Sequence, residues 1–560
     1  MQDLLLPIDQ NVRTMEEKKP VFSYHTFIFP FQWDYIKHRK KNTLYNQRTD
    51  LRDFDRLFEE VGFLRKTPYR IDDSAENYNE YTYFHPFARQ ALYYLNDNDI
   101  LRYYELNDDN GEYVIEYFYF TEGEKNARTL TLALNSICLH VYDTGVGVLS
   151  FNLSNQQYPD KETILIINEY GRRIYPQFLQ SNNRLVAKNS FLANKISGKI
   201  GPLTFSEDFT AYNKPVDVQA TFLPPDHIKK IFGYSGHQQP GDLNCSFVFT
   251  KESEHDNCIR IRQITDDRMF FLCYYENAVL ANSMAHRPEE KCDDQKYQYE
   301  LDEFWYAFVF GDAGRPTVKE DRFQMNQIRK HSYTRWLDYN KKDKHYSGSL
   351  FGFSRDSFVC LGGWNELGIH MNTMYYQMAI LCLVQRASIL RFSFEITKVT
   401  KQVFDKSRNT ARAIKELYEN YIQFINRIYF REITSQIQGI EMYLKFQEVM
   451  GIEKDVKDLD DEMEELFHYL DILEQRRLNK TANLYLPIAA AAGFLGINTF
   501  ISREGESKEG PIGLMNKPLR TNWHELTRLT ADSLTWGDLI TFLLFVWILY
   551  AIIKTIFNKK

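Results

Sequence analysis

An uncharged run near the end of the chain, residues 484–501, most constrains what this sequence can fold into. It holds 18 consecutive residues without an acidic or basic side chain. A bilayer core about 30 Å thick is crossed by roughly 20 apolar residues in helical form. The run is rich in Ala and Gly, which let neighbouring helices approach closely. It therefore predicts a pore-lining transmembrane helix over residues 484–502, with Leu486, Ala489 and Gly493 along one helical face.

A second apolar run, residues 538–557, predicts a second transmembrane helix with aromatic anchors at its ends. Basic residues cluster before the first run, over 476–480, and after the second, over 554–560. By the positive-inside rule both clusters belong in the cytoplasm. The sequence thus predicts a multi-pass protein of the cell inner (plasma) membrane. Both termini are expected to be cytoplasmic, with residues 503–537 as the outer loop.

Long helices are expected ahead of the first run, as a cytosolic helical hairpin and stalk over residues 371–483. The stretch 374–399 is mostly apolar, but its central charges are costly in lipid, so it is expected to be a packed helix outside the membrane. Residues 452–473 carry apolar side chains in a strict heptad pattern, which predicts the second arm of the hairpin. The polar face of this arm lies in line with the small-residue face of the first run. It either continues the pore or is simply solvated.

Residues 453–465 hold eight acidic residues against two lysines. Such a density, Asp461 included, can bind a divalent cation through oxygen ligands. A solvated charged face explains the same pattern equally well, and both interpretations stay open.

The N-terminal two thirds, residues 1–370, are expected to form a β-rich, aromatic α+β cytosolic domain that senses a ligand. Aromatic residues make up 15% of the chain, with 37 Tyr and 41 Phe, which favours strands with large buried side chains. The seven Cys include no Cys-x-x-Cys pair, a pattern typical of a reduced compartment without a zinc site or disulfide framework. A net charge of −7 gives no indication of nucleic-acid binding. The sequence has no His-Glu-x-x-His or Gly-x-Ser-x-Gly motif, so an enzyme is not expected.

Alternating or β-branched patterns predict strands over residues 113–120, 130–134, 136–142, 146–153, 246–250, 259–264 and 269–275. Gly145 and Gly147 resemble part of a phosphate-binding glycine loop, but Ser150 stands where a third Gly is needed. This segment is therefore predicted to be a hairpin turn. A buried strand is also predicted over residues 164–167.

The polar segment that follows residues 164–167 is the candidate ligand site. It offers Asn168, Tyr170, Arg172 and Arg173. Arginines bind phosphate through two parallel hydrogen bonds, and a tyrosine ring can stack on a base. The alternative is that one arginine pairs with a neighbouring glutamate while the other is solvent-exposed. Asp242, in a loop rich in Gly and Pro, is the next candidate.

The C-terminal region resembles the CorA family of divalent-cation transporters. In that family the first of two membrane helices carries a Pro, a Gly six residues later and a Gly-Met-Asn signature. Here these positions are Pro487, Gly493 and Gly496-Ile497-Asn498, with Ile in place of Met. The resemblance implies a homo-oligomer in the lipid bilayer, a pentamer with a tetramer as the alternative, and Mg²⁺ or another divalent cation as the permeant or regulatory ion. It also implies that Gly496, Ile497 and Asn498 form the selectivity filter, although Asn498 can instead cap the helix.

The large N-terminal domain resembles the enlarged CorA-like proteins associated with type III CRISPR systems, through segments 144–151 and 168–173. That resemblance implies a channel effector gated by a nucleotide second messenger, an S-adenosylmethionine–AMP conjugate, in antiviral defence by membrane disruption or ion leakage. The alternative is a constitutive magnesium or other divalent-cation transporter regulated by cytosolic cation. Neither a covalently bound cofactor nor direct nucleic-acid binding is expected.

Overall fold

The computed structural model describes residues 20–37, 46–61, 63–95, 99–121, 124–175, 193–211, 226–233, 246–250, 257–264, 267–288, 294–313, 322–338, 348–404 and 410–496, and positions 543, 546, 547 and 550. The chain divides into two compact units. The first comprises Met1–Asp405 and Glu416–Asp461, and the second Lys406–Lys415 and Glu462–Lys560. All the described strands belong to the first unit.

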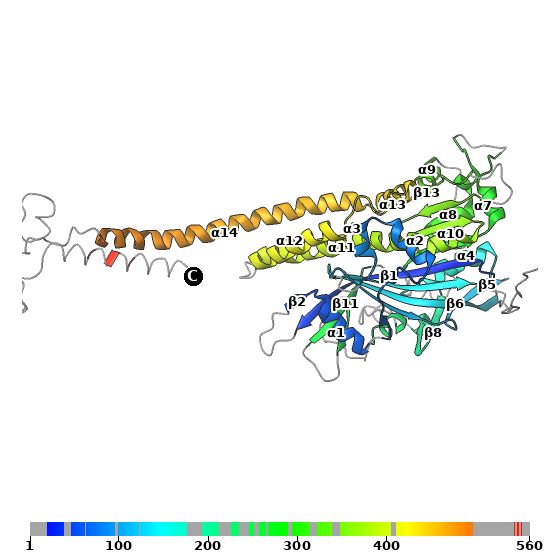
Figure 1. The fold of residues 1–560 in the computed structure, drawn as a ribbon, viewed down its shortest axis with the longest axis horizontal. Helices are drawn as coiled ribbons and strands as arrows, with labels where there is room; N and C mark the ends of the chain where they lie inside the picture. The colour runs from blue at the N-terminus through cyan, green and yellow to red at the C-terminus, as the bar shows by residue number, and fades with distance from the viewer. Residues whose placement is uncertain are drawn as a thin grey trace, which may run out of the picture. The chain divides into compact units, whose positions relative to one another are not determined.

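A mixed sheet of fifteen strands forms the centre of the first unit (Figure 1). The strands are β1 (Ser23–Lys37), β2 (Asn46–Arg48), β3 (Arg65–Lys66), β4 (Leu101–Asn107), β5 (Glu112–Thr121), β6 (Glu124–Tyr142), β7 (Val146–Asn155), β8 (Ala193–Ile200), β9 (Leu203–Asp208), β10 (Ser246–Thr250), β11 (Asn257–Gln263), β12 (Phe270–Glu276), β13 (Ser332–Tyr333), β14 (Leu350–Phe353) and β15 (Ser357–Gly362). Their main order is β13-β14-β15-β12-β1-β7-β6-β5-β8-β9. The central strand β1 pairs antiparallel with β7 along one edge and with β12 and β11 along the other. The pair β12–β15 is parallel.

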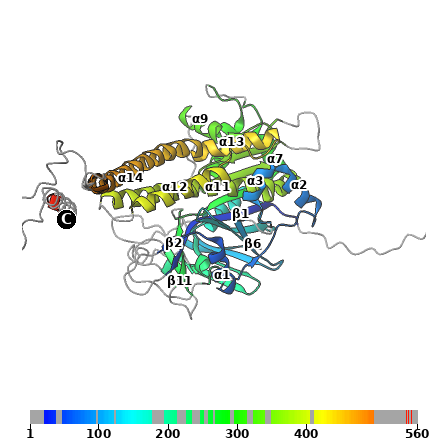
Figure 2. The ribbon, with the colours of Figure 1, turned by 60° about the vertical axis from the view of Figure 1, so that its left-hand side comes forward.

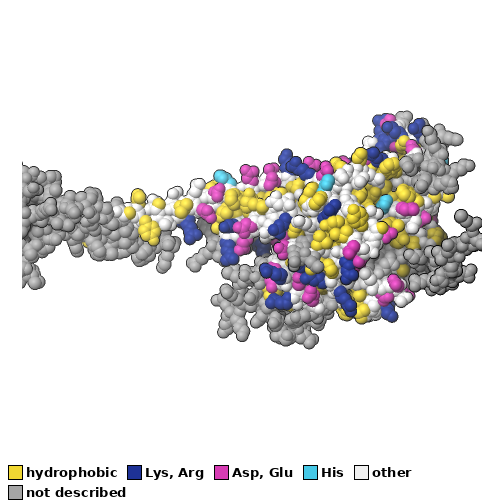
Figure 3. Space-filling view, viewed as in Figure 1, with side chains coloured by type: hydrophobic (Ala, Val, Ile, Leu, Met, Phe, Trp, Pro, Cys, Tyr) yellow, Lys and Arg dark blue, Asp and Glu magenta, His cyan; other side chains and the backbone are white. Residues whose placement is uncertain are grey.

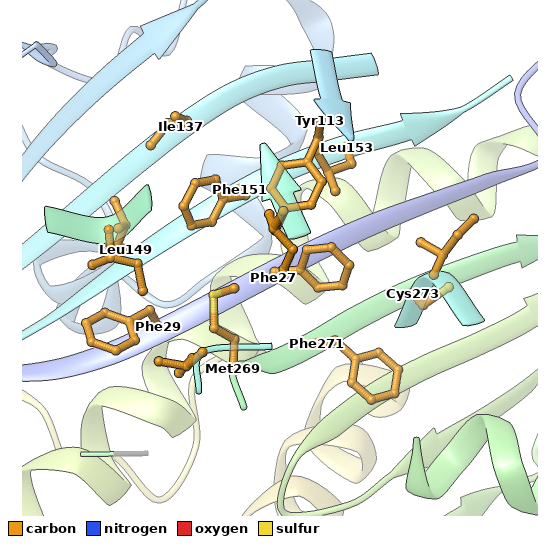
Figure 4. Packing of buried hydrophobic residues seen from close by; sticks show 14 of the residues in the cluster. Phe27, Phe29, Tyr113, Ile137, Leu149, Phe151, Leu153, Met269, Phe271 and Cys273 are labelled. Atoms are coloured by element: carbon orange, nitrogen blue, oxygen red, sulfur yellow. The ribbon is translucent and has the colours of Figure 1, made fainter. Parts of the chain in front are cut away.

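The hydrophobic core of the first unit lies against one face of β1. Successive side chains of a strand point to opposite faces, so Phe27 and Phe29 share a face. Both are fully buried in the core cluster. Figure 4 shows their rings among those of Tyr113, Phe151 and Phe271, which come from β5, β7 and β12. Burial of each such side chain stabilises the fold by roughly 1.5–3 kcal/mol.

Helices cover both faces of the sheet (Figures 1 and 2). The first unit contains α1 (Leu51–Val61), α2 (Ala75–Tyr83), α3 (Pro86–Leu92), α4 (Lys161–Gly171), α6 (Asp226–Lys229), α7 (Ala278–Met284), α8 (Glu303–Phe310), α9 (Arg322–His331), α10 (Asn365–Asn372), α11 (Met374–Phe404) and α13 (Ile437–Met450), with short 3-10 turns η2 (Phe209–Ala211) and η3 (Gln298–Leu301). Helices α1, α4, α6 and α8 contribute to the core cluster around Phe27. Helix α11 covers the opposite face, where the hydroxyl groups of Tyr376 and Ser150 are hydrogen-bonded at 2.7 Å.

Most predicted strands are confirmed, including the hairpin of β6 and β7. Gly145 closes its turn with a φ of 75°, a left-handed conformation that favours glycine. The predicted strand over residues 164–167 is wrong, because these residues lie in α4. Asp160 caps this helix by accepting a hydrogen bond from the backbone N–H of Thr163 at 2.8 Å. The buried Ile164 and Ile167 are three residues apart, so they share a helical face.

The region of the predicted helical hairpin contains three helices, α12 (Thr410–Arg427), α13 and α14 (Ile452–Gly496). Gly451 reverses the chain between α13 and α14 with a φ of 74°. Within the first unit, the Tyr421 hydroxyl of α12 donates a hydrogen bond to Asp460 of α14 at 3.0 Å. Both α12 and α14 continue into the second unit, where α14 contains Pro487.

No helix in the described part of the chain combines the length and the apolar character that crossing a bilayer requires. This finding contradicts the predicted α+β protein with two C-terminal transmembrane helices. It equally contradicts the predicted multi-pass location in the inner membrane. Helix α14 ends at Gly496, so only residues 484–496 of the first apolar run lie within it, fewer than the roughly 20 residues that a span needs. Of the second run, only positions 543, 546, 547 and 550 are described.

Candidate ligand-binding site

A cleft of about 480 Å³ lies in the first unit, where the chain enters β12. One wall comes from α11, a second from the turn between β14 and β15, and a third from the ends of α4 and α8. Its lining residues are Pro30, Arg172, Ile264, Asp267, Arg268, Phe270, Phe310, Arg355, Asp356, Leu383, Arg386, Ala387 and Leu390. The four arginines and two aspartates give this lining an excess of positive charge.

Arg172 forms the buried end of the cleft. It follows the last residue of α4, and its backbone carbonyl accepts a hydrogen bond from the Met269 N–H at 2.8 Å, next to β12. Its side chain donates from Nη2 to the Gly311 carbonyl at 3.2 Å, and its guanidinium lies 4.8 Å from the centre of the Phe271 ring. The residue is only 1% exposed. Its Nε and Nη1 atoms have no hydrogen-bond partner among the described residues.

The countercharges near Arg172 are shared with other arginines. Glu169 lies 3.5 Å from Arg172 and 3.2 Å from Arg268. Asp267 pairs with Arg173 and also lies 3.4 Å from Arg268. The carboxylates of Glu169 and Asp267 therefore provide countercharges for the guanidinium groups of all three arginines. Burial lowers the pKa of Arg172 despite the opposing effect of Glu169, and burial likewise lowers the pKa of Arg173 to about 10.

The opposite wall of the cleft carries Arg355 and Arg386. Arg386 donates from Nη1 to the Arg355 carbonyl at 2.8 Å, which ties α11 to the turn between β14 and β15. Burial lowers the pKa of Arg386, while the nearby Asp356 raises it. Leu383 and Ala387, one turn apart on α11, add an apolar surface beside this charged group. The cleft thus offers cationic donors next to a hydrophobic wall.

This arrangement suits a ligand that is anionic at one end and apolar at the other. Guanidinium groups bind phosphate and carboxylate groups through paired hydrogen bonds. The volume lies within the range of about 300–1,000 Å³ that is usual for small-molecule sites. Elsewhere on the visible face of the first unit, basic and acidic side chains are interspersed (Figure 3). The cleft differs from that surface because four arginines line a single cavity.

The residues predicted to bind a ligand have different surroundings. Arg172 lines the cleft, whereas Arg173 is buried and paired with Asp267. Tyr170 is buried with its ring edge-on to Tyr117 at 5.1 Å. Asn168 accepts a hydrogen bond from Nδ1 of His25 at 2.7 Å. Asp242 lies outside the described residues.

Three cleft arginines, Arg268, Arg355 and Arg386, are absent from the sequence prediction. They lie far from Arg172 along the chain, and only the fold brings them to it. Arg386 could have been marked as a candidate from the sequence, because a charged residue within a mostly apolar helix needs a partner or a function.

The predicted pore residues belong to the second unit. Leu486 is 71% exposed and Ala489 is exposed, and Gly493 and Gly496 lie in the last turns of α14. Ile497 and Asn498 lie outside the described residues, so the predicted filter stays a prediction. Asp461 is exposed on α14, and no group of three or more His, Cys, Asp or Glu residues that could hold a metal occurs within the described ranges.

In comparisons with protein-family models, with curated proteins and with solved structures, nothing matches this chain. Its function is therefore inferred from the chemistry of the cleft.

Proposed function

We propose that this protein is a ligand sensor whose first unit binds a phosphate-bearing nucleotide in the arginine-lined cleft. The observation that carries the proposal is the state of Arg172. Its guanidinium is almost completely removed from water, and two of its three nitrogen atoms lack partners in the described structure. A buried charge without its hydrogen bonds is costly unless something offsets the cost. A ligand oxyanion against Nε and Nη1 would supply both missing acceptors.

The apolar part of the cleft supports a nucleotide rather than a bare inorganic anion. Phe310 and the α11 wall at Leu383 and Ala387 face the same space as the arginines. A base or ribose placed there would bury apolar surface while the phosphate engages the guanidinium groups. The resemblance to CRISPR-associated CorA-like proteins nominates an S-adenosylmethionine–AMP conjugate as the activating ligand.

We infer binding from the guanidinium groups of the cleft, which supply contacts for an anion. The described lining consists of arginines, two aspartates, a proline and apolar side chains, and Asp267 is held in ion pairs with Arg173 and Arg268. The alternative, a magnesium transporter regulated by cytosolic cation, stays a prediction from the resemblance to CorA proteins.

Calorimetry on the Arg172→Met variant tests the proposal. The probes are the S-adenosylmethionine–AMP conjugate, ATP, AMP and pyrophosphate. Methionine keeps much of the side-chain volume and removes the charge, while Glu169 keeps Arg268 as a countercharge at 3.2 Å. Thermal unfolding of the variant checks that it is folded before binding is measured. Loss of charge-assisted hydrogen bonds worth about 1.5–3 kcal/mol each should weaken binding of the phosphate-bearing probe by about tenfold or more.

Arg52→Met serves as the matched control. Arg52 is an arginine of α1 outside the cleft, and its side chain is 84% exposed in a local pair with Asp50. This variant should bind the probes as the native protein does. Native affinity in a correctly folded Arg172→Met protein would show that the ligand binds elsewhere. Absence of binding by all four probes to the native protein would overturn the assignment to nucleotides.

A further inference from the structure

A second cavity, of about 630 Å³, lies in the first unit between α2, the end of α3, strands β4, β6 and β7, and the first turns of α11. It shares no lining residue with the arginine cleft. Its walls are unusually phenolic, with Tyr24, Tyr69, Tyr93, Tyr94, Tyr103 and Tyr376. The lining also includes side-chain carboxylates, amides, one imidazole and one guanidinium, together with hydroxyl, thiol and apolar side chains.

Glu80 is the charged group at the buried end of this cavity. It is 6% exposed, although it lies on α2, a helix that otherwise faces outward. Its Oε1 accepts a hydrogen bond from the Tyr93 hydroxyl at 3.2 Å. No ion pair of the described residues includes it. Burial raises the pKa of Glu80 to about 7, against the smaller effects of hydrogen bonds from Tyr93 and Gln377.

Two further buried side chains at the cavity wall each have one polar atom without a hydrogen-bond partner in the described structure. The Gln377 amide donates to the Glu80 carboxylate, which leaves its Oε1 as an acceptor with no partner in the described structure. His140 is 1% exposed and its Nδ1 is likewise unpaired there. Burial lowers the pKa of His140 to about 3, so the ring is neutral near pH 7. Gln377 thus presents a free acceptor beside a carboxylate, the pattern that a cationic donor requires.

The charge and the aromatic groups of the cavity both favour a cationic ligand. Asp73, Glu80 and Glu105 line it against the single basic side chain of Arg70. The rings of Tyr69 and Tyr93 lie 4.4 Å apart, centre to centre, and form an aromatic surface next to Glu80. The faces of tyrosine rings attract cations, most strongly where water is excluded.

We propose that this cavity is a second binding site, for an organic cation of the primary-amine or guanidine class. Glu80 is the counter-ion and Gln377 Oε1 the second acceptor. The tyrosine rings contact the alkyl or aromatic part of the ligand. The volume leaves room for an organic part beyond the cationic group.

Calorimetry at pH 8 with paired probes tests this site. Phenethylamine and agmatine supply the cations, and 2-phenylethanol is the neutral counterpart of the former. The native protein should bind the amine saturably and at least about tenfold more tightly than the alcohol, as expected for one charge-assisted hydrogen bond. Glu80→Gln should abolish that preference. Glu76→Gln removes an exposed carboxylate one turn away on the same helix and should retain it.

Gln377→Met provides a second measurement that leaves Glu80 in place, and it should weaken amine binding several-fold. Equal binding of the amine and the alcohol, or native amine affinity in both Glu80→Gln and Gln377→Met, would overturn the proposal and leave a water-filled cavity. The arginine cleft is tested separately, because Arg172→Met should leave amine binding unchanged. Failure of either site is therefore distinguishable from failure of the other.

Discussion

Arg172 and Glu80 are buried charges of opposite sign, each placed at the inner end of a cavity. Arg172 shares its countercharges with Arg173 and Arg268, and Glu80 has only neutral hydrogen-bond donors. Buried charges in folded proteins are normally paired, since desolvation is costly. Both residues thus carry a desolvation cost that a ligand of opposite charge can offset, an anion at Arg172 and a cation at Glu80.

Glu80 should make the stability of the protein depend on pH. Burial raises its pKa from 4.5 to about 7, so the folded state holds this proton more tightly than the unfolded chain. The free energy of unfolding is therefore fully retained below the unfolded pKa, and it falls as pH rises through the folded pKa. Glu80→Gln cannot lose a proton. Between acidic pH and pH 8, the free energy of unfolding of this variant should therefore rise relative to that of the native protein. The expected rise is up to roughly 3 kcal/mol, at about 1.4 kcal/mol per pKa unit.

Denaturant unfolding of both proteins at a series of pH values measures this difference. Other buried groups such as His25 and Asp143 also titrate, but they cancel when the two proteins are compared at one pH. For the exposed Glu76→Gln variant, the difference in the free energy of unfolding from the native protein should not change with pH. If the difference for Glu80→Gln does not change with pH either, Glu80 has an ordinary pKa.

The cleft could be predicted from the sequence only in part. Two adjacent arginines next to an apolar segment marked Arg172, although the segment is a helix rather than the predicted strand. Adjacent residues at the end of a helix diverge, so Arg172 enters the cleft while Arg173 turns to Asp267. The placement of Arg172 and Arg386 in one cleft depends on tertiary packing, which one sequence does not specify.

At the level of elements, α11 is fixed to the sheet by a buried ionic network. Arg391 donates to Asp34 of β1 at 3.2 Å, to the Thr144 carbonyl of the β6–β7 turn at 2.6 Å and to Glu395 at 2.8 Å. A cation in a mostly apolar helix thus joins three separate parts of the first unit. This explains why a stretch with central charges is a packed helix.

Arg391→Met should destabilise the first unit strongly. Asp34 is 7% exposed and would lose the cation that compensates its charge. Removing one partner of a buried ion pair typically costs about 3–5 kcal/mol. Urea unfolding followed by tryptophan fluorescence should show the loss. Lys401→Met, at an exposed position of the same helix, should change stability by less than about 0.5 kcal/mol. Equal midpoints for the two variants would contradict the structural role of Arg391.

Local patterns predicted β5, β6 and β7 well because those strands are neighbours in the sequence and form antiparallel hairpins. The overall sheet was not predictable in the same way. The parallel pairing of β12 with β15 and the central position of β1 join segments that are far apart in the chain. The strand prediction for residues 164–167 is wrong because four consecutive apolar residues fit a buried strand and a helix equally well.

For the whole molecule, we propose that exposed apolar residues of the second unit form a contact between copies of the chain. Leu478, Tyr485 and Leu486 of α14 are 67%, 61% and 71% exposed. They are seven and eight residues apart, so they lie along one helical face. We expect the full-length chain to form a homo-oligomer through this face, as the resemblance to CorA proteins implies.

Mass photometry of the full-length protein checks this expectation. A Leu478→Glu/Leu486→Glu double variant should shift the distribution toward the mass of one chain. Ile437→Glu, at a 61% exposed position of α13 in the first unit, should leave the assembly unchanged. A native protein that is monomeric at micromolar concentration would contradict the expectation.

Helix α11 forms part of both cavities, with Gln377 in the phenolic one and Arg386 in the arginine-lined one. These positions are about 14 Å apart along one continuous helix, at about 1.5 Å per residue. Thermodynamic linkage then imposes a reciprocal relation. If occupancy of the phenolic cavity alters nucleotide affinity by some factor, the nucleotide must alter amine affinity by the same factor. If the two proposed sites are coupled in this way, the response to one ligand would depend on the concentration of the other.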